Sequence, residues 1–139
     1  MFTKGETYRR REIHALFGGQ EQGGISTPSN HKVIFMFSGE TGEQYGYRDG
    51  WTQDGKYLYT GEGQVGDMTF IRGNRAIRDH EEDGRELHLF EYAKIGHVRY
   101  VGQMLCSGVQ MREGPDRTGQ LRKVIVFELT PFDPAVHRS

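Results

Sequence analysis

Residues 57–68 read YLYTGEGQVGDM, and the interpretation of the whole chain depends on this stretch. Its first four residues are typical of a β-strand, and the rest matches the G-x-G-x-x-G pattern of dinucleotide-binding loops. In that fingerprint a helix begins at the glycine turn, so that its N-terminus faces the pyrophosphate. Here the turn is followed by strand-like residues, Met68–Ile71, and then by Gly73. The pattern therefore favours a glycine-rich turn between two strands over a nucleotide site.

The composition is that of one folded domain. The chain has 139 residues, of which 35% are hydrophobic and 27% charged, and this length buries a core without disulfides or metal. Its 20 glycines are about twice the usual share of roughly 7%, which predicts many turns and few long helices. We expect a single domain over residues 1–131 and a frayed tail over residues 132–139.

Short apolar runs separated by glycine-containing turns predict consecutive strands. Besides residues 57–60, the predicted strands are Val33–Phe37, Met68–Ile71, Leu87–Tyr92, His97–Val101 and Val124–Leu129. Two stretches carry helix signals: Thr7–Phe17 ends at a glycine pair, and Gly73–Asp83 has Asn74 as a candidate cap. The predicted fold class is α+β, mainly β, with a barrel or strongly bent sheet and one or two short helices.

Charge and cysteine content limit the classes of function. The formal net charge of −1 excludes a global basic field, so any nucleic-acid binding must come from local patches. The single Cys106 cannot form an internal disulfide, and the N-terminus lacks an apolar signal-peptide segment. No apolar run approaches the roughly 20 residues that span a bilayer. We therefore expect a cytoplasmic protein with no membrane partner.

Four motifs along the chain resemble those of one family, in the same order. Residues 54–63 resemble the acidic-Gly-x-aromatic-x-Tyr-Thr-Gly-x-Gly stretch of SRA (SET- and RING-associated, YDG) domains. Residues 9–25 resemble the family's N-terminal histidine and glycine-rich loop, residues 73–77 its Asn-Arg-Ala motif, and residues 98–102 its Val-Arg-Tyr-Asp-Gly strand. The resemblance is greatest to the SRA-like domains of bacterial McrA-type restriction endonucleases, in which the reader lies beside an HNH nuclease.

The resemblance implies a PUA-like barrel that binds double-stranded DNA containing a C5-modified cytosine, either 5-methylcytosine or 5-hydroxymethylcytosine. It implies a reader without catalytic residues or cofactor, with an HNH nuclease as a neighbouring domain or partner. Base flipping costs a few kcal/mol, and aromatic stacking recovers about 1–3 kcal/mol per base. The N4 amino group of cytosine is best recognised by a carboxylate. The pocket therefore needs aromatic faces and an acidic side chain.

Position relative to the family motifs selects the pocket residues. Tyr47 and Tyr59 are the expected stacking pair, and Asp49 is the expected carboxylate. The full predicted pocket is Tyr47, Asp49, Trp51, Tyr59, Thr60 and Gly61. Two alternatives are structural: Tyr59 as a core residue, and Asp49 as a turn residue before Gly50.

Two polar loops and two arginine clusters are the expected DNA contacts. A side chain with hydrogen-bond donors must fill the vacancy left by the flipped base, and Gln20 and Gln22 are preferred for this role because their loop is free of apolar residues. The predicted loop contacts are Gln20, Gln22, Arg72, Asn74 and Arg75, and the predicted phosphate contacts are Arg9, Arg10, Arg11 and Arg78. The alternative for any charge run is a solvated face.

Other functional classes fit the sequence less well. A metal-dependent nuclease or hydrolase could use His80–Asp83 with His88, but no H-x-E or C-x-x-C pairing accompanies them, and we assign no metal ligand. Cys106 follows an apolar run with no histidine nearby in sequence, which favours a small buried thiol. A reader of another modified base is the third class, since barrels related to SRA domains also bind modified RNA or adenine.

Overall fold

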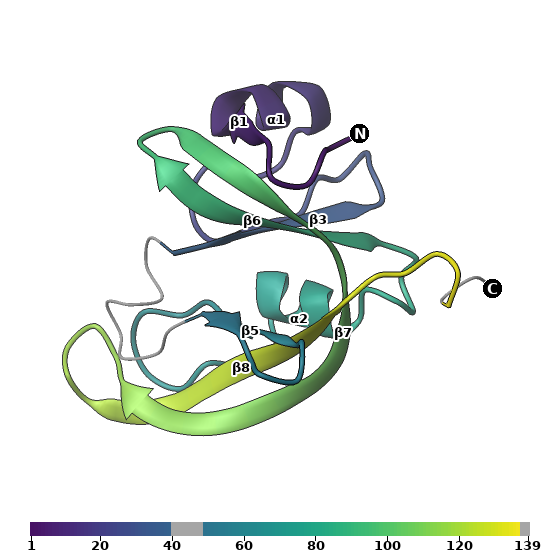
Figure 1. Ribbon diagram of the computed structural model, residues 1–139. Coiled ribbons are helices and arrows are strands. Elements are labelled where there is room, and N and C mark those ends of the chain that lie inside the picture. Colours follow the sequence, from purple (N-terminus) through teal and green to yellow (C-terminus); the bar gives the residue numbers. More distant parts are fainter. Residues whose placement is uncertain (40–48, 137–139) are drawn as a thin grey trace.

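The computed structural model describes residues 1–39 and 49–136, and its architecture is one strongly curved sheet with two short helices (Figure 1). The elements in chain order are β1 (Thr7–Arg9), α1 (Arg10–Phe17), β2 (Ile25–Ser26), β3 (Val33–Ser38), β4 (Gly50–Trp51), β5 (Tyr57–Thr60), α2 (Arg72–Arg78), β6 (Glu86–Lys94), β7 (His97–Pro115) and β8 (Leu121–Pro131). Neither helix is long and apolar enough to cross a membrane, among the residues described.

The long strand β7 organises the sheet. The strand order is β2-β3-β6-β7-β8-β5-β4, with β1 paired to β7, and all pairs are antiparallel except β3 with β6. β7 pairs with β6 through its first half and with β8 through its second half, with a register shift between Cys106 and Gly108. At this irregularity the backbone N–H of Cys106 donates to Nε2 of the buried His80, at 3.0 Å. The imidazole of His80 thus satisfies this backbone N–H.

Two tyrosines on β5 join opposite ends of this sheet. Tyr57 and Tyr59 are two residues apart, so both side chains point to the same face, and both are buried. The Tyr57 hydroxyl lies 2.9 Å from Glu91 Oε2 and 3.0 Å from Ser38 Oγ, while the Tyr59 hydroxyl donates to the Gly24 carbonyl at 2.7 Å. These bonds link β5 to the β3 and β6 end of the sheet, and they close the curve.

The core has two parts that follow this curvature. The larger cluster fills the concave side, with Tyr57, Ile77 and Phe127 among its fully buried members, and α2 lies inside the curve (Figure 1). The smaller cluster, which includes Phe35 and Phe90, is covered by α1 through Ile13. Each helix therefore covers a different part of the sheet.

The structure confirms the predicted fold class and corrects several boundaries. Met68–Ile71 is not a strand: the Met68 N–H does donate to the Lys123 carbonyl, but the segment then turns into α2. α2 ends at Arg78 rather than Asp83, and residues 7–9 form β1 rather than the start of a helix. The second half of β7 was not predicted, because its glycines and polar residues interrupt the apolar pattern.

The Tyr57→Phe substitution tests the closure of the sheet. It removes the hydroxyl but keeps the buried ring, so the free energy of unfolding should fall by about 1–3 kcal/mol through the unmatched Ser38 and Glu91 groups. Urea denaturation measures this change, with the exposed Tyr92→Phe as the matched control. Equal stabilities for the two variants would contradict a role for the hydroxyl in closing the sheet.

Candidate functional site

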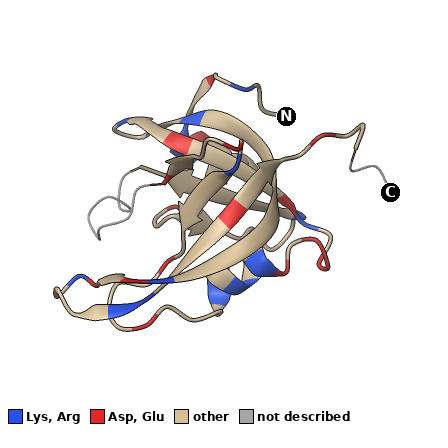
Figure 2. Ribbon diagram, turned by 60° about the horizontal axis from the view of Figure 1, so that its bottom comes forward, with Lys and Arg blue, Asp and Glu red and all other residues tan. Residues whose placement is uncertain are grey.

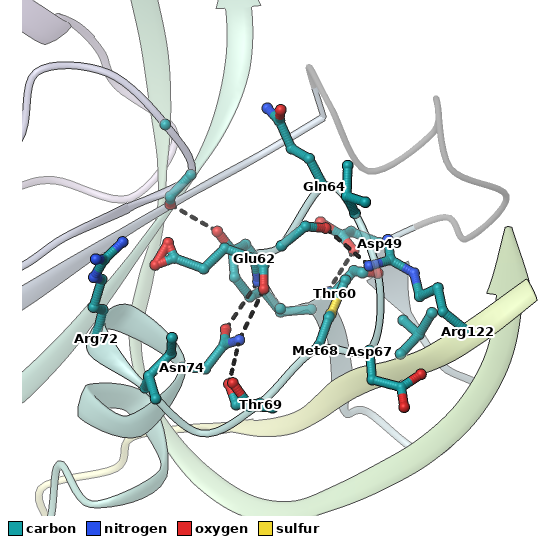
Figure 3. Close-up of a pocket in the computed structure, with 18 of the residues that line it drawn as sticks. Asp49, Thr60, Glu62, Gln64, Asp67, Met68, Thr69, Arg72, Asn74 and Arg122 are labelled. Carbon is teal, nitrogen blue, oxygen red and sulfur yellow. Dashed lines mark hydrogen bonds between the residues drawn. The ribbon is translucent and has the colours of Figure 1, made fainter. Parts of the chain in front are cut away.

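A cavity of about 430 Å³ opens beside the segment that follows β5 (Figure 3). Its wall is formed by Gly23, Gly24, Phe37, Asp49, residues 59–65, residues 67–69, Ile71, Arg72, Asn74, Arg122 and Val124. These residues come from both ends of the strand order, so the cavity exists because the sheet closes on itself. Its volume lies within the range of roughly 300–1,000 Å³ that is usual for small-ligand pockets.

The Asp49 carboxylate is fixed at this wall by two strands. Its Oδ1 accepts a hydrogen bond from the Thr60 N–H at 2.8 Å, and its Oδ2 accepts one from the Ser38 hydroxyl at 2.9 Å. Ser38 is itself within 3.0 Å of the Tyr57 hydroxyl. The carboxylate is therefore an oriented acceptor that bridges β3 and β5, and it is more than a turn residue before Gly50.

Tyr59 belongs to both the core and the cavity wall. It is 2% exposed, and a Cβ on Gly24 would lie 2.9 Å from its hydroxyl, so only glycine leaves room for the bond to the Gly24 carbonyl. Burial raises its pKa well above the usual value of 10.0, and the carboxylates of Asp49 and Glu62 raise it further. The hydroxyl therefore stays protonated and acts as a fixed donor.

The backbone N–H groups at the rim are already engaged within the protein. The Thr60 N–H donates to Asp49, the Gly61 N–H to the Ile125 carbonyl and the Glu62 N–H to Asn74. Glycine is required at position 61 by Asn74, because a Cβ there would lie 2.8 Å from Asn74 Oδ1. Gly61, a predicted pocket residue, also lines the cavity.

Asn74 fastens the two ends of the loop together. Its side chain is 1% exposed, accepts from the Glu62 N–H at 2.8 Å, and donates to the Glu62 and Thr69 carbonyls at 2.9 and 3.0 Å (Figure 3). All of these hydrogen bonds go to backbone. The Asn74 amide, which was predicted to contact DNA, is therefore buried and holds the loop instead.

The tip of the β7–β8 hairpin fixes the outer part of the same loop. Asp116 accepts the Gly66 N–H at 3.0 Å, and the Arg117 N–H donates to the Gln64 carbonyl at 2.8 Å. Asp116 also accepts hydrogen bonds from Thr118 and Gln120, and the Thr118 hydroxyl, followed by the Gly66 N–H, lowers the pKa of this carboxyl. The hairpin thus sets the position of one cavity wall.

Glu62 places a second carboxylate at the cavity. Burial raises its pKa above the usual value of 4.5, while the Gly73 N–H and the charge of Arg72 act in the opposite direction. Arg72, which was predicted as a DNA contact, lines the cavity with an exposed side chain. Arg72 has a positive φ of 47°, a conformation uncommon outside glycine.

Three predicted site residues lie elsewhere. Trp51 is 52% exposed, packs edge-on against the Tyr57 ring and does not line the cavity. Arg78 donates twice to Asp79 and stacks over Phe70, and Arg75 lies within 3.6 Å of the same carboxylate. The basic residues of α2 lie on the lower side of the molecule in Figure 2, away from the N-terminus. A neighbouring acid thus neutralises this cluster in part.

Tyr47 lies outside the described residues. In the predicted glutamine loop, Gln20 and Gln22 have different environments. Gln20 bonds to the Thr27 N–H and hydroxyl, which closes residues 20–27 into a turn. Gln22 is exposed, and the adjacent Gly23 and Gly24 line the cavity. Of the two glutamines, Gln22 is the one placed to reach outward.

The N-terminal arginines surround a second hollow of about 370 Å³. It is lined by Arg9, Arg10, Arg11, His14, Glu21, Gly96 and His97. Arg10 lies 3.8 Å over the Phe37 ring and donates to His14, so its guanidinium is partly committed to the fold. Arg9 and Arg11 are exposed.

The residues considered for metal or nucleophilic chemistry have structural partners. His80 bonds to the Arg85 carbonyl and the Cys106 N–H, and His88 lies between Tyr100 and Glu86. Burial raises the pKa of the Cys106 thiol to about 11. Within residues 1–39 and 49–136, no three side chains of the metal-ligating types lie close enough to hold an ion.

The sequence did not reveal several residues of the cavity wall. Phe37 and Met68 were expected only as strand residues, and Arg122 was not considered. Asp116, which holds the loop from outside the cavity through Gly66, was not considered either. The dipeptide Asp116-Arg117 before Thr118-Gly119 does carry a turn signal, but its partner Gly66 is distant in the chain. Only the fold brings these residues together.

The curved sheet and its side cavity define a small, mainly β domain with a pocket of ligand size. The chain belongs to the ScoMcrA-like SRA domain family, whose family model matches residues 4–139. No curated protein sequence matches significantly.

Solved structures of SRA domains share this fold. The sulfur-binding and SRA domains of ScoMcrA, complexed with phosphorothioated DNA, are 26% identical with a TM-score of 0.74, covering 94% of this chain and 40% of that one. The SRA domain of SUVH5, solved with hemi-methylated CG DNA, is 21% identical with a TM-score of 0.67. The match covers 94% of this chain and 89% of the SUVH5 chain. The DNA modification-dependent restriction endonuclease AspBHI is 17% identical with a TM-score of 0.62. The match covers 87% of this chain and 66% of the AspBHI chain. The chain thus spans 40% of the length of the ScoMcrA chain that it matches.

The Asn74→Ala substitution tests how the loop is held. It leaves one N–H and two carbonyls without a protein partner, so the free energy of unfolding should fall by about 1–3 kcal/mol. Amide exchange at Glu62 should also become faster. Urea denaturation and hydrogen exchange measure both effects, with the exposed Asn30→Ala as control. Unchanged exchange at Glu62 would show that Asn74 does not restrain the loop.

The Asp116→Asn substitution should produce a pH-dependent loss of stability. Because hydrogen bonds lower the pKa of Asp116 in the folded state below its usual value of 3.8, its stabilising effect is fully present above that value and is lost as pH falls toward the folded-state pKa. The wild type should therefore exceed the variant at pH 7, and the gap should narrow below pH 3.8. Urea midpoints at a series of pH values measure the gap. A constant gap would contradict this account of Asp116.

Proposed function

We propose that this domain reads a C5-modified cytosine in duplex DNA by flipping the base into the cavity beside β5. The observation that carries the proposal is a carboxylate, Asp49, held by two strands at the wall of a 430 Å³ cavity that the Tyr59 ring also lines. The ligand would be 5-methylcytosine, with 5-hydroxymethylcytosine as the second candidate. A base modified at C5 can be enclosed on all sides only after it leaves the stack.

Asp49 is suited to distinguish cytosine from thymine. Cytosine presents an N4 amino donor, whereas thymine presents an O4 acceptor that a carboxylate repels. The hydrogen bonds from the Thr60 N–H and the Ser38 hydroxyl orient the carboxylate at the cavity wall, and a carboxylate oxygen can accept more than one hydrogen bond. We assign to Asp49 the recognition of the N4 amino group.

Stacking would supply most of the binding energy of the flipped base. Tyr59 offers a ring held rigid by its buried hydroxyl, so little conformational entropy is lost on binding. Tyr47 is proposed as the opposite face. Each stacked base contributes about 1–3 kcal/mol, enough to offset the cost of flipping.

The DNA would contact the surface around the cavity mouth and around the N-terminal hollow. We assign Gln22 to the vacancy in the duplex, and the exposed Arg9, Arg11 and Arg72 to phosphates. The relatives support modified DNA as the ligand class, since ScoMcrA was solved with phosphorothioated DNA and SUVH5 with methylated DNA. We further propose a non-enzymatic reader in the bacterial cytoplasm that acts with an HNH nuclease domain or partner.

A binding panel tests the proposal. Identical duplexes should carry cytosine, 5-methylcytosine, 5-hydroxymethylcytosine, N6-methyladenine or a phosphorothioate linkage, with an RNA duplex as a further arm. Tightest binding to a C5-modified duplex is expected, measured by fluorescence anisotropy at a fixed salt concentration. Equal affinities would refute the proposal, and preference for adenine methylation or RNA would identify a reader of another base.

Pocket variants assign the preference to residues. Tyr59→Ala and Tyr47→Ala should abolish the preference and leave weak, salt-sensitive binding, whereas Tyr59→Phe should retain it because the ring does the stacking. Asp49→Asn should lower discrimination against thymine by about 1–3 kcal/mol. The Trp51→Ala control lies outside the cavity and should bind as the wild type does. Full preference in both tyrosine-to-alanine variants would disprove the stacking pair.

A further inference from the structure

Arg122 of β8 is a buried cation that forms no ion pair among the described residues. It is 4% exposed, and its Nη1 donates to the Gly63 and Gly66 carbonyls at 3.0 and 2.9 Å. Its Nε and Nη2 are buried and have no hydrogen-bond partner in residues 1–39 and 49–136. An unmatched charge in the interior is destabilising, and a bound water, ion or ligand is one explanation of such a group in a native protein.

The loop beside Arg122 offers hydrogen-bond donors for an anion, while the carboxylates of Asp49, Glu62 and Asp67 lie on the same cavity wall. The guanidinium lines the cavity and extends from β8 toward the segment that carries Thr60 and Glu62 (Figure 3). In front of it, Gly63, Gln64 and Val65 are exposed, and their backbone N–H groups form no hydrogen bond within the described part of the chain. Exposed N–H groups backed by a fixed positive charge are the elements of a phosphate-binding loop.

We propose that the loop of residues 63–65, backed by the charge of Arg122, holds a backbone phosphate of the flipped nucleotide. This inference rests on the proposed function, because flipping rotates the nucleotide about its backbone and draws the adjoining phosphates toward the cavity mouth. The N–H groups make the direct contact, and Arg122 supplies the opposite charge from behind the loop. The phosphate in turn provides the counter-charge that Arg122 lacks in the free protein.

A purely structural role for Arg122 predicts a different pattern of DNA binding from that of a phosphate counter-charge. As a clamp on two carbonyls, Arg122 would affect all DNA equally through the shape of the loop. As the phosphate counter-charge, it affects the modified duplex alone, since only a flipped nucleotide brings its phosphate to this loop. Arg122→Gln removes the charge, and Arg122→Lys retains it with a different geometry. Arg112→Gln is the matched control, because Arg112 lies on the same hairpin and does not line the cavity.

Titrations of 5-methylcytosine and unmodified duplexes at several salt concentrations test the proposal. Arg122→Gln should bind the modified duplex at least tenfold more weakly, with a salt slope reduced by about 0.9, the value for one phosphate contact. Its binding to the unmodified duplex should be unchanged, and Arg122→Lys should recover most of the affinity. Wild-type affinity and slope in Arg122→Gln, or an equal loss on both duplexes, would overturn this inference alone. Absence of any preference in the wild type would overturn the proposed function, and this inference with it.

Amide spectra of the wild-type protein give a test that does not depend on the variants folding. The amide resonances of Gly63, Gln64 and Val65 should move downfield on saturation with the modified duplex, as expected for N–H groups that donate to a phosphate. The unmodified duplex should leave them in place. Unchanged resonances in the saturated modified complex would overturn the proposal.

Discussion

The site depends on a chain of hydrogen bonds that closes the curved sheet. The chain runs from Glu91 through the Tyr57 hydroxyl to Ser38, and from Ser38 through the Asp49 carboxylate to the Thr60 N–H. It joins β6, β3 and β5, which lie on both sides of the curve. Because the same bonds that close the sheet also orient Asp49, the orientation of this carboxylate is a property of the fold.

The cavity wall opposite the sheet is held by polar side chains rather than by apolar packing. Asn74, Asp116 and Arg122 are each at most 5% exposed, and each binds the backbone of the loop that follows β5. A loop fixed at several points in the free protein loses little further entropy when it binds a ligand. Such preorganisation would favour the proposed base flipping, which has to compete against base stacking in the duplex.

Local patterns in the sequence predicted the elements but not the contacts between them. The apolar runs Val33–Phe37 and Tyr57–Thr60 predicted buried strands correctly, because their own side chains determine that structure. Met68–Ile71 was misassigned, since it is tied to distant β8 by few bonds and then feeds α2. The roles of Asn74 and Arg122 could not be predicted, because their partners are far away or are backbone groups that any sequence supplies. Placement of Asp49 and Tyr59 at one cavity came from the family resemblance.

Base flipping is the central claim, and the imino protons of the DNA report on it directly. In a duplex with one 5-methylcytosine, the guanine opposite that base gives an imino resonance only while the pair is intact. The account predicts that saturation with the protein removes this one resonance and preserves those of the pairs beyond its immediate neighbours. A saturated complex that keeps the resonance, with the modified base still paired, would contradict the account.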